Sequence, residues 1–300
     1  MHQTGQIYRP PSEASVQRLE VTIGCSHNKC SFCTMYRKTP FRVAPLEDVE
    51  MDLKELHDRG EKITRIYLTN GDPFVLGTDR LVKIAELVHQ YLPEVEVLTC
   101  YASIRNLKAK SLEDLKLLKS VGYDELYVGL ETAYAPAVKL INKGFTVEEA
   151  YENIGKLKEA GMKYFVFTTK HHDGFCMWDT KETDYKITSS ECPYHTAPHP
   201  DILKELFGAF QKRDFMIGAY FSKPDWNNPY YWSDRWQHGD RNVNYKIKNH
   251  PWMWEKFCDF TYNQIKELMT GYGKVDIIWL DGGWVAPENR NQDIKMDRIV

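Results

Sequence analysis

Short apolar and aromatic runs alternate with longer amphipathic stretches along the whole chain. The runs, rich in β-branched and aromatic residues, predict seven strands at residues 19–23, 64–69, 95–101, 125–130, 164–169, 216–221 and 275–280. The stretches carry apolar residues at helical spacing and predict six helices at residues 46–59, 78–91, 111–121, 146–160, 200–213 and 251–270. Strands that alternate with helices are typical of an α/β fold whose parallel sheet is covered by helices.

The predicted strand ends carry residues that are suited to chemistry. They are Cys25, Asn70, Gly71, Asp72, Glu131, His171, His172, Tyr220 and Asp281. In α/β sheets and barrels, ligands bind at the C-terminal ends of the strands. About seven β/α units predict an arrangement similar to a TIM barrel, which has eight. We therefore expect a barrel that is one unit short or open.

Bulk composition is that of an ordinary globular chain. Of the 300 residues, 42% are hydrophobic and 27% are charged, and the net charge of −3 gives no electrostatic case for binding nucleic acid or an acidic membrane. No apolar run approaches the ~18 residues of a membrane helix, and the polar N-terminus lacks the pattern of a signal peptide. We therefore expect a cytoplasmic protein.

Tryptophan marks a change of composition in the middle of the chain. Residues 1–162 contain none, and all eight tryptophans lie from Trp178 onward. Tryptophan-rich loops often bind carbohydrate, because an aromatic face stacks on the C–H groups of a sugar ring. Packing in a core is the alternative, and it is the better explanation for Trp252 and Trp254 on a predicted helix.

Three of the seven cysteines, Cys25, Cys30 and Cys33, form a Cys-x4-Cys-x2-Cys motif. Thiolates are the usual ligands of iron–sulfur clusters, and three of them leave one iron of a four-iron cluster open. The alternative is a zinc site, which usually takes four ligands, with His27 as a possible fourth. The motif favours the cluster, because no second Cys/His pair lies nearby.

With this motif, residues 16–162 resemble the radical S-adenosylmethionine (SAM) superfamily, in which the common spacing is Cys-x3-Cys-x2-Cys. Residues 68–72 (Leu-Thr-Asn-Gly-Asp), 101–105 (Tyr-Ala-Ser-Ile-Arg) and 127–132 (Tyr-Val-Gly-Leu-Glu-Thr) match its later strands. The resemblance implies a 4Fe-4S cluster and SAM as cofactors. It implies that the cluster ligands are Cys25, Cys30 and Cys33 and that the SAM-binding residues are Asn70, Gly71, Asp72, Arg105 and Glu131.

The run Thr-Lys-His-His-Asp-Gly-Phe at 169–175, together with residues 217–226 and 275–284, makes residues 158–300 similar to α-L-fucosidases of glycoside hydrolase family 29. This resemblance implies an α-L-fucoside as substrate and Asp281 as the nucleophile of a retaining double displacement. A carboxylate at a strand end suits that role, because a rigid element aims it. The implied sugar-binding residues are His171, His172, Trp178, Tyr220 and Trp279.

The two resemblances meet near residues 156–162. We expect a partial radical SAM barrel at 1–162 and a partial fucosidase barrel at 163–300, which together form one composite barrel of four and three units. A retaining glycosidase needs a second carboxylate, and the resemblance places it beyond residue 300. The later radical SAM strands are also absent, so we expect each catalytic site to be incomplete.

Three functions remain open at this point. The chain is a radical SAM enzyme whose cofactor half works, an α-L-fucosidase with weak or no turnover, or a non-catalytic chimera. In the last case the fusion is recombined, misassembled or designed, and at most residual cofactor or fucose binding is expected. Loss of a general acid costs roughly 10²–10⁴-fold in rate, which is why the expected fucosidase turnover is low.

Overall fold

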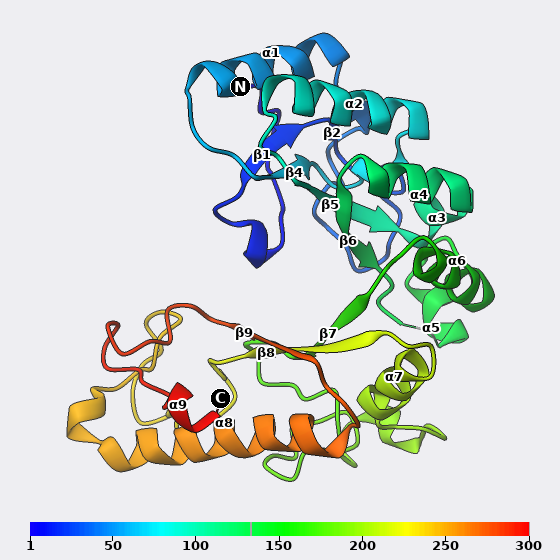
Figure 1. The fold of residues 1–300 in the computed structure, drawn as a ribbon. Coiled ribbons are helices and arrows are strands. Elements are labelled where there is room, and N and C mark those ends of the chain that lie inside the picture. The colour runs from blue at the N-terminus through cyan, green and yellow to red at the C-terminus, as the bar shows by residue number, and fades with distance from the viewer. Residues whose placement is uncertain (133, 300) are drawn as a thin grey trace. The chain divides into compact units, whose positions relative to one another are not determined.

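The computed structural model describes residues 1–132 and 134–299. The chain divides into two compact units, Met1–Met162 and Lys163–Val300 (Figure 1). Each unit has its own parallel sheet with helices packed on it. The predicted α/β class with parallel strands is therefore confirmed.

The sheet of the first unit has the strand order β1-β4-β5-β6, and all neighbouring strands are parallel. The strands are β1 (Gln17–Glu20), β4 (Arg65–Thr69), β5 (Val97–Ser103) and β6 (Tyr123–Gly129). The helices are α1 (Leu46–Asp58), α2 (Thr78–Tyr91), α3 (Ile104–Lys108), α4 (Leu112–Ser120), α5 (Ala135–Leu140) and α6 (Val147–Glu159), with short 3-10 turns at η1 (Pro11–Glu13) and η2 (Pro73–Val75).

The predicted strand at residues 19–23 is two elements, which corrects that boundary. After β1 the chain turns at Val21, whose N–H donates to the carbonyl oxygen of Thr69. The next two residues form β2 (Thr22–Ile23), which pairs antiparallel with β3 (Arg42–Val43). The small β2–β3 sheet thus ends the apolar run and directs the following loop away from β1.

The two faces of the first sheet differ in chemistry. One face packs on the helices through residues that are fully buried, such as Leu19, Leu68 and Cys100. The other face carries three tyrosines, Tyr67, Tyr101 and Tyr127, whose rings meet edge to face with centroids 6.0–6.5 Å apart. Buried tyrosines need hydrogen-bond partners, and Tyr127 donates to the buried carboxylate of Glu13 at 2.6 Å.

The sheet of the second unit has the order β7-β8-β9, again with parallel neighbours. Its strands are β7 (Tyr164–Lys170), β8 (Met216–Ser222) and β9 (Ile277–Asp281). Its helices are α7 (Ile202–Gln211), α8 (Pro251–Gly271) and α9 (Met296–Ile299), with 3-10 turns at η3 (Pro193–Thr196) and η4 (Ile247–Asn249). Long irregular segments follow β7, β8 and β9, and they supply much of the chemistry described below.

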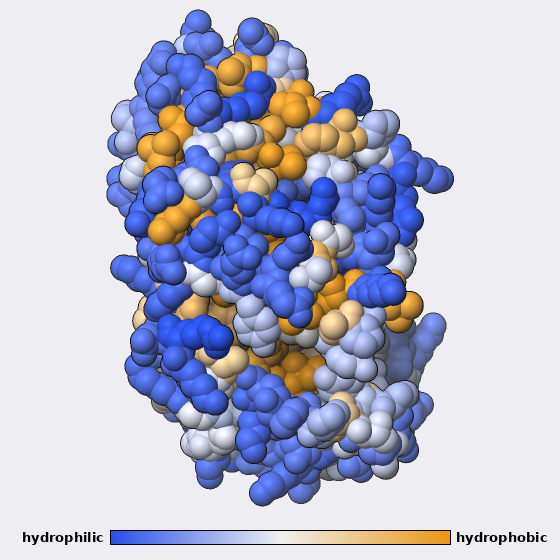
Figure 2. Space-filling model, turned by 90° about the vertical axis from the view of Figure 1, so that its right-hand side faces the viewer, coloured by the Kyte–Doolittle hydropathy of each residue, from blue (hydrophilic) through white to orange (hydrophobic). Residues whose placement is uncertain are grey.

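Hydrophobic residues lie in several separate groups on a mostly hydrophilic surface in the view of Figure 2. Large exposed side chains include Phe32, Met35 and Leu140, which lie in or directly beside the cysteine segment. Within the described residues, no helix has the length and apolar character needed to cross a membrane.

Candidate functional site

The cysteine segment forms an irregular loop directly after β2. Arg37 ties this loop together, because its guanidinium donates to the carbonyl oxygens of Cys33 at 2.8 Å and Cys30 at 2.7 Å. The side-chain amide of Asn28 donates to the carbonyl oxygen of Tyr36 at 2.7 Å. Cys25, Cys30 and Cys33 are free and partly buried. The loop is thus held by hydrogen bonds from its own side chains to its own carbonyl oxygens.

The segment from Asn70 to Asp72 follows β4 and packs against the cysteine loop. The N–H of Gly71 donates to the carbonyl oxygen of Gly24 at 3.2 Å, and the Ser26 hydroxyl donates to the Asp72 carboxylate. Burial raises the pKa of Asp72, and the hydrogen bond from Ser26 opposes that rise. Gly71 has no room for a side chain, since a Cβ there would lie 2.3 Å from the ring of Tyr36.

Asn70 is the unusual member of this segment. Its residue is 1% exposed, and both polar atoms of its side-chain amide lack a partner among the described residues. Buried amides are normally hydrogen-bonded, so an unpartnered one calls for an explanation such as a ligand or water. The amide thus marks a place at this strand end where a polar group can be bound.

Arg105 and Glu131 approach the same loop from the ends of β5 and β6. Glu131 accepts a hydrogen bond from Lys143 at 3.0 Å. A Cβ at Gly144 would lie 2.8 Å from the ring of His27 and 3.0 Å from Cδ of Arg105, so these chains are in close contact there. The structure therefore brings the predicted cysteine, Asn70–Asp72, Arg105 and Glu131 segments together. Lys143, which was not predicted from the sequence, joins them through its hydrogen bond to Glu131.

The donor set of the loop fits an iron–sulfur cluster. Burial raises the pKa of Cys25 and Cys30, and metal coordination removes a thiol proton outright. Among the described residues, the only His/Cys/Asp/Glu trio whose ligand atoms all lie within 4.8 Å of one another is His171, His172 and Asp281. Three thiolates without a fourth protein ligand suit a four-iron cluster better than a structural zinc ion, which takes four ligands.

A second group of side chains meets at the C-terminal ends of β7, β8 and β9. Asp281, the last residue of β9, accepts hydrogen bonds from the Tyr220 hydroxyl and from the N–H of Gly282 at 2.6 Å. Nε2 of His172 lies 3.6 Å from the same carboxylate. The ring of His171 lies parallel to the ring of Tyr220, with centroids 6.0 Å apart. The ring of Trp279 is tilted relative to the ring of Tyr220, also with centroids 6.0 Å apart. Parallel pairing explains this meeting, because Tyr220 and Trp279 are register partners.

His172 is enclosed by aromatic rings. Its side chain is 11% exposed, and its ring centroid lies 5.3 Å from Trp226 and 5.0 Å from Trp284. Burial, followed by the neighbouring His171, lowers the pKa of His172, while Asp281 opposes that shift. His172 is therefore neutral at pH 7, and its buried Nδ1 has no partner among the described residues. A neutral imidazole can donate at one nitrogen and accept at the other.

Trp178 lies outside this group. It is fully buried, its indole N–H donates to Glu267 on α8 at 3.1 Å, and its ring centroid is 6.5 Å from that of Phe221. These contacts are those of a packed core residue. The structure thus brings together His171, His172, Tyr220, Trp279 and Asp281, and it places Trp178 in the packing behind them.

Lys170 and Asp225 support this site and were not predicted from the sequence. Lys170 is fully buried, and its ammonium donates to Asp225 at 3.0 Å and to Gln264 at 2.9 Å. A Cβ at Gly174 would lie 2.2 Å from Asp225, so the loop that carries His172 closes tightly over the pair. The sequence feature that could have indicated this role is Lys170 itself, a lysine at the end of an otherwise uncharged strand. A lysine is rarely buried unless it is paired.

Comparison with known protein families gives two matches. The radical SAM superfamily model matches residues 19–183, and the alpha-L-fucosidase model matches residues 127–300. Each match covers more than half of the chain. The two overlap at residues 127–183, a segment that contains the boundary between the two compact units.

Individual relatives match only part of the chain. Tissue alpha-L-fucosidase of Mus musculus is 32% identical over 130 residues, which are 43% of this chain and 25% of the mouse protein. The crystal structure of an alpha-L-fucosidase from Bacteroides thetaiotaomicron is 35% identical over 45% of this chain and 26% of its own, with a TM-score of 0.35. The cobalamin-dependent S-adenosylmethionine radical enzyme OxsB is 19% identical over 52% and 24%, with a TM-score of 0.42. The chain spans about a quarter of the length of these relatives.

Proposed function

We propose that the second unit binds terminal α-L-fucosyl residues at the ends of β7, β8 and β9, with Asp281 as the nucleophile, and that the first unit holds a 4Fe-4S cluster and SAM. The chain belongs to the radical SAM superfamily through residues 19–183 and to the α-L-fucosidase family through residues 127–300. Because the chain spans about a quarter of the length of the relatives named above, the activity of the whole protein is part of the proposal.

The orientation of Asp281 is the observation that carries the fucosidase proposal. Tyr220 and the N–H of Gly282 fix the carboxylate, and hydrogen bonds to a charged group are the strong ones. In a retaining reaction, a carboxylate oxygen forms a bond to the anomeric carbon as the bond to the aglycone oxygen breaks. Water then attacks the same carbon and releases the carboxylate. His171, neutral His172 and Tyr220 line the place where the sugar hydroxyls lie, and Trp279 offers a ring face.

The departing aglycone oxygen needs a proton from a second carboxylate, which the resemblance places beyond residue 300. We therefore propose fucose binding with weak or no turnover for these 300 residues. Nitrophenolate leaves without a proton, so 4-nitrophenyl α-L-fucoside is the sensitive substrate. Turnover of this compound is expected to be slow and to stop in Asp281→Asn, while the exposed control Asp259→Asn keeps it. Calorimetry that finds no fucose binding would overturn the proposal.

The radical SAM proposal rests on the convergence of the cysteine loop with Asn70–Asp72 and Glu131. Cys25, Cys30 and Cys33 would hold the cluster, and the unpartnered Asn70 amide and Glu131 would hold polar groups of SAM. The cluster supplies one electron to the SAM sulfonium when both are bound. This chain's own residues would anchor the two cofactors.

Anaerobic reconstitution with iron and sulfide tests the radical SAM proposal. We expect a brown protein with about four irons per chain and a loss of most of that iron in Cys30→Ser. Cys192→Ser is the matched control, because Cys192 is also partly buried but lies in the second unit. A colourless wild-type protein, or equal iron in the two variants, contradicts the proposal. If the chain binds neither fucose nor an iron–sulfur cluster, the remaining possibility is a non-catalytic chimera.

We also propose that the seven parallel strands form one composite, incomplete barrel, with four units from the radical SAM part and three from the fucosidase part. Among the described residues, β6 pairs only with β5 and β7 pairs only with β8, so each has a free edge. Free strand edges are an aggregation hazard that proteins usually cover. The division into residues 1–162 and 163–300 is the corresponding domain proposal.

A further inference from the structure

Trp284 connects the Asp281 site to a second cluster of side chains. One side of the connection is His172, which lies 3.6 Å from Asp281 and has its ring centroid 5.0 Å from that of Trp284. The other side is Arg241, whose guanidinium lies over the Trp284 ring at 4.3 Å from the centroid. The Trp284 indole thus lies between Arg241 and His172, and His172 lies beside the proposed nucleophile, Asp281.

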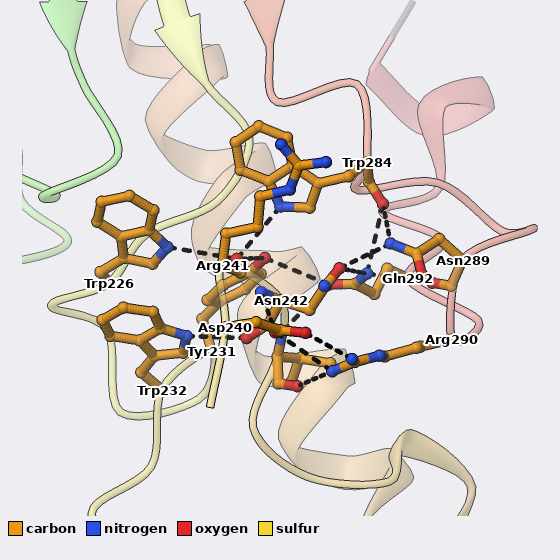
Figure 3. Close-up of polar contacts among 11 residues, drawn as sticks. Trp226, Tyr231, Trp232, Asp240, Arg241, Asn242, Trp284, Asn289, Arg290 and Gln292 are labelled. Atoms are coloured by element: carbon orange, nitrogen blue, oxygen red, sulfur yellow. Dashed lines mark hydrogen bonds and ion pairs between the residues drawn. The ribbon is translucent and has the colours of Figure 1, made fainter. Parts of the chain in front are cut away.

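A single backbone oxygen holds this cluster together. The carbonyl of Arg241 accepts from the indole N–H of Trp226 at 3.4 Å, the indole N–H of Trp284 at 3.2 Å and the hydroxyl of Tyr231 at 3.0 Å (Figure 3). Trp226 in turn stacks on Trp232, with centroids 5.1 Å apart and planes within 11° of each other. The two indoles that flank His172 therefore share one anchor with Arg241.

A buried polar network supports the cluster from below. The amide of Gln292, which is fully buried, donates to Asn242 at 2.9 Å and accepts from the Tyr231 hydroxyl at 3.2 Å. Asn289 donates to the same Asn242 oxygen at 2.6 Å and to the carbonyl of Trp284 at 2.8 Å (Figure 3). A satisfied buried network fixes its neighbours, so the indoles and Arg241 are positioned before any ligand arrives.

The Arg241 side chain is exposed and unused as a donor. No carboxylate or carbonyl of the described residues accepts from its guanidinium, whereas nearby Arg290 is paired with Asp240 at 2.6 Å. An arginine that is held over an indole while its N–H groups stay free is prepared to bind a planar anion in bidentate fashion. The adjacent tryptophan faces favour a ring beside that anion.

We propose that Trp226, Trp284 and Arg241 form a subsite for the group attached to fucose, and that this subsite selects a ring that carries a carboxylate. The proposal rests on the proposed fucoside-binding site, since the subsite begins at His172. It assigns a substrate class to that site: fucosides whose aglycone is acidic. Trp226 and Trp284 contact the aglycone ring, and the Arg241 guanidinium binds its carboxylate.

Calorimetry with three uncleavable probes tests the subsite: L-fucose, phenyl 1-thio-α-L-fucoside and its 4-carboxyphenyl analogue. We expect the carboxyphenyl probe to bind about tenfold more tightly than the phenyl probe, with an advantage that shrinks at high salt. In Arg241→Gln the two aryl probes should bind equally, and fucose should bind as in the wild type. Arg241→Lys should keep only part of the advantage, because an ammonium cannot bind both oxygens in plane.

Arg235→Gln is the matched control, since Arg235 is exposed on the same loop, and it should keep the full advantage. Equal binding of the two aryl probes by the wild type, or an unchanged advantage in Arg241→Gln, overturns the subsite while fucose binding still supports the proposed function. No binding of fucose or of either aryl probe overturns the proposed function, and the subsite with it. Unfolding midpoints of the variants show that each is folded.

Discussion

Single residues in the second unit divide into those that face the proposed sugar site and those that hold it in place. His171 and His172 face the site, while the preceding Lys170 points into the interior and pairs with Asp225. Asp225 also accepts from the backbone N–H groups of Asn227 and Asn228, at 3.1 and 2.9 Å. One buried ion pair thus ties the His171–His172 loop to the segment after β8.

Lys170→Met should lower the free energy of unfolding of the second unit by about 3–5 kcal/mol, because it leaves the buried Asp225 carboxylate unpaired. Urea unfolding followed by tryptophan fluorescence measures this directly, since all eight tryptophans lie from Trp178 onward. Lys295→Met is the control, because its ion pair with Glu255 is on the surface and contributes little. A second change, Asp225→Asn, should restore part of the loss. An unchanged urea midpoint in Lys170→Met would refute this role.

His172 makes the stability of the second unit depend on pH. Its pKa in the folded state lies below the ordinary value of 6.5. Between 6.5 and that lower pKa, the unfolded chain binds a proton at His172 and the folded chain does not, so stability falls as pH drops through this window and is unaffected above it. The urea midpoint should therefore fall as the pH is lowered below 6.5, and it should fall less in His172→Gln. The exposed His195→Gln is the control, and equal slopes in all three proteins would contradict the prediction.

At the scale of elements, regular structure with a strong local signal was predictable. The expected helix at 78–91 coincides with α2 (Thr78–Tyr91), and the helix expected at 111–121 is α4 (Leu112–Ser120), which begins with a capping box formed by Ser111 and Asp114. Short elements were missed or merged: β3, α3 and α5 have two to six residues each, and β2 was joined to β1 in the strand predicted at 19–23. Periodicity cannot identify so few residues, because they are stabilised by contacts with distant segments.

The same reasoning separates the predicted and the unpredicted site residues. Residues at the ends of parallel strands come together whatever the loops do, which is why the proximity of Asp281, Tyr220 and His172 could be predicted from the sequence. Arg241 lies on a long irregular segment, where tertiary contacts decide the conformation. Its stacking on Trp284 joins loops after two different strands, and nothing local in the chain encodes that contact.

A substitution at Gly71, in the segment after β4, tests whether the close contact between this segment and the cysteine loop is needed for the proposed cluster to bind. Gly71→Ala should reduce the iron bound after reconstitution, because its Cβ would lie 2.3 Å from the Tyr36 ring and 3.0 Å from the Gly24 carbonyl oxygen. Gly77→Ala is the control, since a Cβ there meets nothing within 4 Å. Iron content and far-ultraviolet circular dichroism should be measured together. Full iron loading of Gly71→Ala would show that this contact is not needed to form the site.

At the scale of the whole molecule, the proposed composite barrel predicts that the stability of each unit depends on the other. Each parallel sheet has edge strands, β6 in one and β7 in the other, and Lys163 begins the second unit directly before β7. Covering those edges within one barrel would make each unit depend on the other for stability. Two independent domains would instead unfold separately and survive a cut between them.

Limited trypsin digestion distinguishes these cases, because cleavable lysines lie at the boundary. Lys156 donates to the carbonyl oxygens of Leu107 and Lys110 at 3.0 and 2.8 Å, whereas Lys163 is exposed. Trypsin should therefore cut at the exposed Lys163 before Lys156, and in a composite barrel this cut should leave the chain folded as one body. Any cut chain should stay associated in size-exclusion chromatography and unfold in one calorimetric transition. Two fragments that separate and each unfold cooperatively would exclude the composite barrel, because neither sheet would then need the other.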